Sequence, residues 1–187
     1  MKKQTWKAGT QLFPLPVVMV SLGQGEKKNI ITIAWTGIVN SEPPMTYISL
    51  RPERHSYGIL EETGEFVINL VNEKLTRATD LAGVKSGRNT DKFKSFGLTP
   101  VPSSVLSCPM IDESPLNLEC RVTQKISLGS HTMFLAKIEV VNVAENLLDS
   151  KGRLCLEKAN LVSFVHGAYH ALGRQLGTLG FSVKKNK

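Results

Sequence analysis

Hydrophobic residues fall in short runs along the chain, and most runs have the length and composition of β-strands. Each run is rich in β-branched residues or alternates apolar with polar positions, and turn-forming residues separate the runs. The predicted strands are 14–22, 30–35, 47–50, 66–71, 116–122 and 132–143, with a further short strand at 152–156. The two runs that flank the turn at 128–131 predict an antiparallel hairpin.

Helical spacing is confined to short segments between these runs. Residues 56–63 have apolar positions at helical spacing and end at Gly64, which is typical of a helix C-terminus. A second helix is predicted from the N-cap Asn72 through Leu81, closed by Gly83, and a third lies in DKFKSFG at 91–97. Two segments have little or no clear period and predict irregular structure, the proline-rich 97–115 and the C-terminal 160–181.

The central stretch, residues 29–57, predicts a strand, a break at Gly37, a turn at the two prolines 43 and 44, a second strand and a basic loop. In total about six or seven strands, mostly in hairpins, accompany two or three short helices. The predicted fold class is therefore mainly β (α+β), a β-barrel with short helical insertions. A doubly wound α/β sheet is the alternative, but it requires regular strand–helix alternation and a glycine fingerprint, and neither is present.

Length and charge narrow the class of protein. The 187 residues fit one domain, 1–187, with an ordered core at about 12–173 between two basic tails. The net charge is +7, but six of the 23 basic residues lie in residues 1–10 and 181–187, so the body is almost neutral. This distribution argues against a nucleic-acid partner.

Apolar runs and cysteines indicate the compartment. No run is long enough to span a bilayer, and no apolar segment follows the N-terminal lysines, so we expect a cytoplasmic protein without a membrane partner. Cys108, Cys120 and Cys155 are odd in number and widely spaced, which predicts buried free thiols.

The candidate chemistry points to a phosphorylated, aromatic ligand. The sequence has no Gly-rich phosphate loop and no GxSxG motif, so a site must be assembled from strand edges and loops. Arg51, Arg54, Ser56 and Lys92 form a set suited to a terminal phosphate, with solvated surface charges as the alternative. Trp35 suits the wall of a flat-ring site or the core.

Histidines add one ligand donor and no metal site. His131 at the predicted hairpin tip suits a hydrogen-bond donor to a bound ligand, or else faces solvent. His166 and His170 stand four residues apart, a spacing that places two imidazoles on one helical face, but no third ligand lies nearby in sequence. We therefore predict no metal site.

Several segments together resemble the flavin reductase-like family, and within it the flavoredoxin-type branch. The resemblance covers residues 12 to about 173 and is carried, in order, by NIITIAW, NSEPP, ISLRPERHSYGILEETGEFVINLV, AGVKSGRNTDKF, LNLEC and GSHTMFLAKI. It implies a split β-barrel that binds FMN non-covalently, and a homodimer with the flavin near the subunit interface.

The resemblance also implies cofactor-binding positions, carried over residue by residue. Those along the flavin ring and ribityl chain are Asn29, Thr32, Ile33, Ala34, Trp35 and Thr36. Those at the phosphate are Ser56 and Lys92, with Ser49 and Arg51 close by. Ser86 and Gly87 fall in a loop closing over the cofactor, His131 reaches it from the hairpin tip, and Phe164 approaches from the C-terminal segment. No catalytic residue is assigned, but His131 is suited to tuning the flavin because a nearby dipole or cation stabilises the anionic reduced form.

Two functions are compatible with this resemblance. The first is an oxidoreductase in which NAD(P)H reduces bound FMN, and electrons pass to free flavin, ferric complexes or a protein acceptor. The alternative is a flavoredoxin-type carrier that passes electrons between redox protein partners and has no nicotinamide site. A flavin-binding protein without turnover ranks last. The sequence does not discriminate between the first two.

Overall fold

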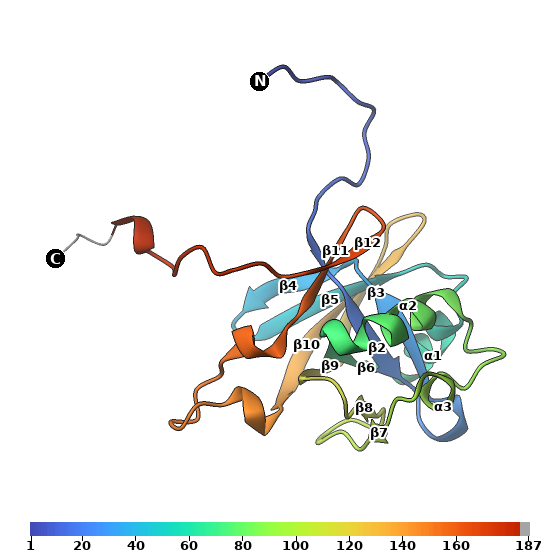
Figure 1. Ribbon diagram of the computed structural model, residues 1–187. Coiled ribbons are helices and arrows are strands. Elements are labelled where there is room, and N and C mark those ends of the chain that lie inside the picture. The colour runs from blue at the N-terminus through green and yellow to red at the C-terminus, as the bar shows by residue number, and fades with distance from the viewer. Residues whose placement is uncertain (184–187) are drawn as a thin grey trace.

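The computed structural model describes residues 1–183 and is built around a seven-stranded antiparallel sheet (Figure 1). The strand order is β3-β2-β6-β9-β10-β5-β4. Its strands are β2 (Val18–Leu22), β3 (Asn29–Ile33), β4 (Thr36–Ser41), β5 (Pro44–Leu50), β6 (Glu65–Leu70), β9 (Leu116–Ser127) and β10 (Thr132–Val143). The prediction of a mainly β fold is confirmed.

Smaller elements surround this sheet. A second sheet has the order β1-β11-β12, from β1 (Leu15–Pro16), β11 (Val162–Val165) and β12 (Ala168–Ala171), and β7 (Pro100–Val101) pairs with β8 (Met110–Ile111). The α-helices are α1 (His55–Thr63), α2 (Thr76–Val84) and α3 (Lys92–Phe96). Short 3-10 turns occur at Gly25–Lys27, Glu73–Leu75, Glu145–Leu147, Leu156–Ala159 and Phe181–Val183.

Chain connectivity forces the large sheet to curl into a barrel. The strands at its two ends, β3 and β4, are joined by only Ala34 and Trp35. The end strands of a flat seven-stranded sheet lie roughly 28 Å apart, whereas this link reaches at most about 11 Å. The Ser49 N–H donates to the Trp35 carbonyl at 2.9 Å and joins the link to β5. The sheet therefore closes on itself near residues 34–35.

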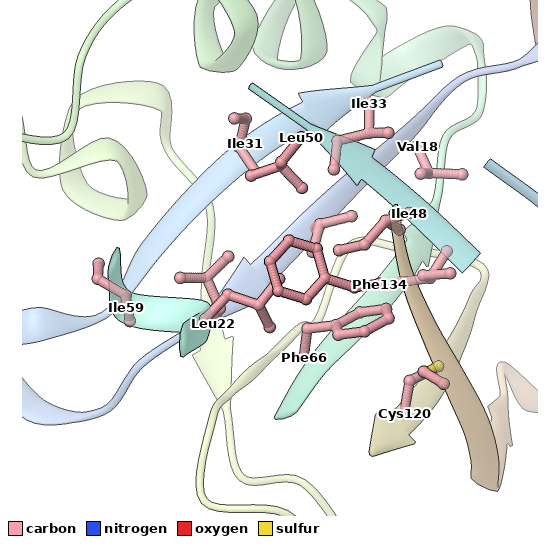
Figure 2. Packing of buried hydrophobic residues seen from close by; sticks show 14 of the residues in the cluster. Val18, Leu22, Ile31, Ile33, Ile48, Leu50, Ile59, Phe66, Cys120 and Phe134 are labelled. Atoms are coloured by element: carbon pink, nitrogen blue, oxygen red, sulfur yellow. The ribbon is translucent and has the colours of Figure 1, made fainter. Parts of the chain in front are cut away.

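The inside of the barrel is filled by large apolar side chains. Phe66 from β6 and Phe134 from β10 lie at its centre, and Cys120 packs into the same cluster (Figure 2). Alternate residues of β2, Val18, Val20 and Leu22, belong to this cluster as well. Cys108 is also buried, so the prediction of buried thiols is confirmed for two cysteines, while Cys155 is half-buried. Burial raises the pKa of the Cys108 thiol to about 12.

A second apolar cluster lies outside the barrel wall. Val17 and Met19, next to the inward-facing residues of β2, pack with Ile30 of β3, Ala82 of α2 and Phe93 of α3. This outer layer explains why every residue of β2 is buried. It also fixes α2 against β3, and this contact shapes the candidate site described below.

Buried polar side chains hold the proline-rich segment 97–115 to the barrel. Glu119 on β9 is fully buried and accepts from the N–H groups of Ser104, Val105 and Leu106 at 2.7, 2.9 and 3.2 Å, and from Asn142 Nδ2 at 2.8 Å. Burial raises the pKa of Glu119, but these hydrogen bonds outweigh it and leave the pKa below its ordinary value. The segment is irregular as predicted, apart from the short β7–β8 pair.

Some boundaries differ from the prediction. Gly37 does not break a strand: it lies inside β4 opposite Tyr47, where a Cβ would come within 3.3 Å of the tyrosine ring. The strand expected at 152–156 is wrong, because this region has only an isolated bridge, Leu148 to Leu154, before a 3-10 turn. The prediction of irregular structure at 160–181 misses the β11–β12 hairpin.

The predicted helices exist, with a shifted end in one case. Asn72 caps the 3-10 turn Glu73–Leu75 by accepting from the Leu75 N–H at 3.1 Å, and α2 then continues past Gly83 to Val84. No helix within residues 1–183 combines the length and apolar character that crossing a bilayer requires.

We expect Glu119→Gln to lower the free energy of unfolding by about 2 kcal/mol, because an amide replaces an acceptor-only group that faces four donors. Since the folded pKa is depressed, the carboxylate stabilises the fold fully above its unfolded pKa of about 4.3, and this contribution is lost as the pH falls through the folded pKa. Urea unfolding from pH 7 to pH 3 should show the difference between wild type and variant shrinking.

The matched control for this experiment is Glu139→Gln. Glu139 is exposed on β10, and its ion-pair partner within residues 1–183 is Lys137, at 2.8 Å. Glu139→Gln should lower the free energy of unfolding by less than about 1 kcal/mol. Equal effects of the two substitutions would contradict the role of Glu119 as the anchor of the segment.

Candidate functional site

Two adjoining cavities lie beside β3, between the barrel wall and α2. The first cavity has a volume of about 320 Å³ and the second about 210 Å³. Ile31, Arg54 and Gly83 line both, so the two are contiguous. A ligand with an extended shape can therefore occupy them together.

The first cavity is bounded by the β3–β4 link, the end of β5, α2 and the β11–β12 hairpin. Its lining residues are Val17, Ile31, Thr32, Ile33, Ala34, Trp35, Ser49, Leu50, Arg51, Arg54, Gly83, His131, Phe164 and Tyr169. Because β3 is the end strand of its sheet, one of its edges has no strand neighbour within residues 1–183. The cavity is thus mainly apolar, with backbone polar groups along one side.

Close approach of α2 to β3 defines the floor between the cavities. A Cβ on Gly83 would come within 3.2 Å of Thr32 Cβ, and the Thr32 hydroxyl donates to the Thr79 carbonyl. Glycine at position 83 therefore allows the helix to lie directly on the strand.

Trp35 and His131 form a stacked pair at the first cavity. Their rings are nearly parallel, at 9°, with centroids 6.5 Å apart. Trp35 is 37% exposed, so it is a cavity residue and not a core residue. Burial and the neighbouring Arg51 lower the pKa of His131, so its imidazole is neutral at pH 7. His131 thus provides a polar ring and no full positive charge.

The second cavity is polar and is built from the start of α1, the end of α2 and the loop at 85–88. Asn29 Nδ2 donates to Ser56 Oγ at 2.9 Å. The Gly87 backbone lies against the same amide, since a Cβ there would be 2.2 Å from Asn29 Oδ1. Only glycine lets the loop approach Asn29 this closely.

Lys92 is the dominant charge of the second cavity. It is only 4% exposed, and its Nζ donates to the carbonyls of Ile30 at 2.7 Å and Ala82 at 2.6 Å. Within residues 1–183 no carboxylate lies within 4.0 Å of this ammonium group. Burial, with a smaller contribution from Arg54, lowers the pKa of Lys92 to about 8. Such a group favours an anionic ligand, which would offset its desolvation.

All the residues predicted for the cofactor site except Thr36 line these cavities. The first contains Thr32, Ile33, Ala34, Trp35, Ser49, Arg51, His131 and Phe164, and the second contains Asn29, Ser56, Ser86, Gly87 and Lys92. Thr36 is buried, and its hydroxyl donates to the Tyr47 carbonyl at 2.6 Å. Of the predicted phosphate set, Arg51 lines the first cavity, Ser56 and Lys92 line the second, and Arg54 lines both.

Sequence reasoning missed Tyr169, which lines the first cavity beside Phe164. The available signal in the sequence was the pair His166–Gly167 between VSFV and AYHA, since glycine readily adopts the positive φ of a tight turn. In the structure both residues have positive φ, 47° and 89°. This turn also removes the helical spacing assumed for His166 and His170, which lie on a hairpin. Within the described residues no group of three His, Cys, Asp or Glu side chains could hold a metal ion.

Comparison with known proteins identifies the family. The family model of the flavin reductase like domain matches residues 10–172. The solved structure of a flavoredoxin of Desulfovibrio vulgaris (Miyazaki F) is 33% identical, with a TM-score of 0.90, and the similarity covers 98% of this chain and 100% of that one.

Two relatives extend the comparison. An uncharacterized protein of Archaeoglobus fulgidus is 31% identical over 75% of this chain and 78% of its own. The NADH-dependent FMN reductase AsuE2 of Streptomyces nodosus subsp. asukaensis is 24% identical over 72% of this chain and 71% of its own. The family match covers most of the chain, and the solved flavoredoxin matches it over nearly its whole length. This chain therefore belongs to the flavin reductase-like family, and it is similar to the flavoredoxins within it.

Proposed function

We propose that the chain binds FMN non-covalently, with the phosphate in the second cavity and the flavin ring in the first. The observation that carries this proposal is the buried ammonium group of Lys92, which has no acidic partner among residues 1–183. A phosphate dianion provides the missing counter-charge, and an aromatic ring suits the apolar cavity that adjoins it.

The side chains of the second cavity fit a phosphate group. Two of the three N–H donors of Lys92 are directed to carbonyls, which leaves the third for a ligand oxygen. Arg54 adds a second cation and Ser56 a hydroxyl donor, both on the lining of the same cavity. Gly87 places backbone close to Asn29 at the rim, so the 85–88 loop can cover a bound group.

We expect Lys92→Met to weaken FMN binding by about 30-fold or more, because a buried charge contact with the phosphate is lost. Riboflavin has the same ring and no phosphate, so its affinity should change less than about threefold. Fluorescence titration of both ligands measures the two effects, and riboflavin binding also reports that the variant is folded.

Lys94→Met is the matched control for this substitution. Lys94 lies on the same helix, α3, and is exposed. Lys94→Met should leave the affinities for FMN and riboflavin unchanged. A loss of riboflavin affinity equal to the loss of FMN affinity in Lys92→Met would place the effect outside the phosphate site and overturn the assignment.

We infer further that the protein is an oxidoreductase that accepts electrons from NAD(P)H. FMN, when bound, supplies both hydride and single-electron chemistry. In this arrangement Trp35 and His131 line the ring cavity, and the neutral His131 offers a dipole to the ring. The similarity to an NADH-dependent FMN reductase supports this function.

A carrier that exchanges electrons only with protein partners is the second candidate. The similarity to a flavoredoxin supports it. The N-terminal Lys2, Lys3 and Lys7, all exposed, suit an acidic redox partner.

Anaerobic absorbance measurements separate the two candidates. We expect the FMN-reconstituted protein to show flavin bands that bleach within seconds of adding NADH or NADPH. Bands that persist until dithionite or a reduced ferredoxin is added would contradict the reductase function and favour the carrier function. A failure to retain FMN after reconstitution would contradict both.

We also infer that a second copy of the chain covers the terminal segments. Residues 1–12 and 172–183 leave the body of the fold, as Figure 1 shows, and they carry apolar side chains in solvent. Leu12 is 82% exposed and Leu176 is 80% exposed, and Leu172, Leu179 and Phe181 are exposed as well. Several exposed apolar side chains on segments that leave the body of the fold are typical of a surface that is covered in the assembled protein.

We expect light scattering after size exclusion to give twice the chain mass of 20.6 kDa. A Leu176→Ser, Leu179→Ser double variant should shift this equilibrium toward the monomer, because it removes apolar area from the interface. Val105→Ser changes an exposed residue elsewhere and serves as the control. A wild-type protein of single-chain mass would contradict the inference.

A further inference from the structure

Tyr169 lies on the β11–β12 hairpin, at the wall of the first cavity. It stands opposite Phe164 in the hairpin register, and the two rings meet edge to face with centroids 5.6 Å apart. Both side chains line the cavity and pack on the outer apolar cluster. The pair therefore forms one apolar wall for a flat ring.

A side-chain hydrogen bond joins this wall to α2. The Tyr169 hydroxyl donates to Asp80 Oδ1 at 3.1 Å, across 89 residues of sequence. Asp80 lies three residues before Gly83, so it is one helical turn from the glycine that lines the opposite side of the cavity. The bond thus connects two walls of the first cavity directly.

The chemistry of the pair suits a stable donor and acceptor. Burial, together with the Asp80 carboxylate, raises the pKa of Tyr169 to about 12, so the hydroxyl remains protonated at neutral pH. A hydrogen bond from a neutral hydroxyl to a carboxylate is stronger than one between two neutral groups.

The position of the hairpin explains why such a bond matters. β12 is the outer strand of the three-stranded sheet, and β11 pairs with β1 over only two residues, Leu15 opposite Phe164 and Pro16 opposite Ser163. A short pairing leaves the hairpin weakly held at this side. The Val162 N–H of β11 also donates to the Val71 carbonyl at 3.1 Å, so the inner strand has a second attachment, and the Tyr169–Asp80 contact adds one at the outer strand, β12.

We propose that Tyr169 and Asp80 form a latch that sets the width of the first cavity and thereby holds a flat aromatic ring in it. Tyr169 is then a positioning residue for the ring, acting through the hairpin and Phe164. This inference rests on the proposed binding of flavin. It differs from the phosphate assignment because it concerns the ring alone.

Dissociation rates of two flavins test the latch. We expect Tyr169→Phe and Asp80→Asn each to speed dissociation of FMN by about three- to tenfold in stopped-flow fluorescence, as loss of one charge-assisted hydrogen bond predicts. Riboflavin should dissociate faster by the same factor, since the latch acts on the ring. The double variant should be no faster than Tyr169→Phe alone, because Asp80→Asn keeps an amide oxygen acceptor and only weakens the same hydrogen bond that Tyr169→Phe removes.

Two control variants make the result specific. Tyr57→Phe removes a hydroxyl that lies 3.3 Å from Thr132 Oγ1, and Glu73→Gln removes an exposed carboxylate just before α2. Neither residue lines the two cavities, and both variants should dissociate flavins at the wild-type rate.

Other results would contradict the latch alone or the latch together with flavin binding. Unchanged rates in Tyr169→Phe and Asp80→Asn, or a change for FMN without riboflavin, would overturn the latch while flavin binding stands. Additive effects in the double variant would also overturn it, because the two side chains would then act separately. A wild-type protein that binds neither flavin would overturn the proposed function and the latch together.

Discussion

The two-residue link between β3 and β4 is the constraint on which the rest of the structure depends. Because Ala34 and Trp35 must connect the two ends of a seven-stranded sheet, the sheet has to curl, and its ends meet beside the link. The same geometry leaves Trp35 at the surface of the barrel, next to the stacked ring of His131. Barrel closure and the shape of the first cavity therefore have one cause.

Burying a cation in a folded protein raises the free energy unless hydrogen bonds to protein groups replace those the cation made to water. Lys92 meets this requirement in part, through the carbonyls of Ile30 and Ala82, which belong to the strand and the helix that flank the second cavity. Its ammonium group thus ties β3 to α2 and also gives the cavity its charge. Among the described residues every buried side-chain polar atom has a hydrogen-bond partner, and Lys92 uses two of its three donors, so its third donor and its charge remain for a ligand.

The sequence predicts the regular parts of this protein well, because strand periodicity and turn residues are local signals. It also identifies most of the cavity residues: residue chemistry indicates the phosphate set, Trp35 and His131, and the resemblance supplies the others. That Lys92 is buried, or that Thr36 turns its hydroxyl to Tyr47, depends on packing between distant segments. Tyr169 was missed because its neighbours mix aromatic, glycine and histidine residues, so only the tight turn before it indicated a strand.

The two edges of the large sheet are protected in different ways. β4 carries exposed Ile38 and Val39, and a register shift between Ile38 and Asn40 interrupts its pairing with β5. Such a bulge makes an edge a poor template for another strand. β3 has no comparable irregularity, and its edge is covered instead by α2, with the Ile30 carbonyl occupied by Lys92. The helix and lysine that shape the cavities therefore also shield the barrel from strand addition, so a substitution there that alters ligand binding also alters the protection of this edge.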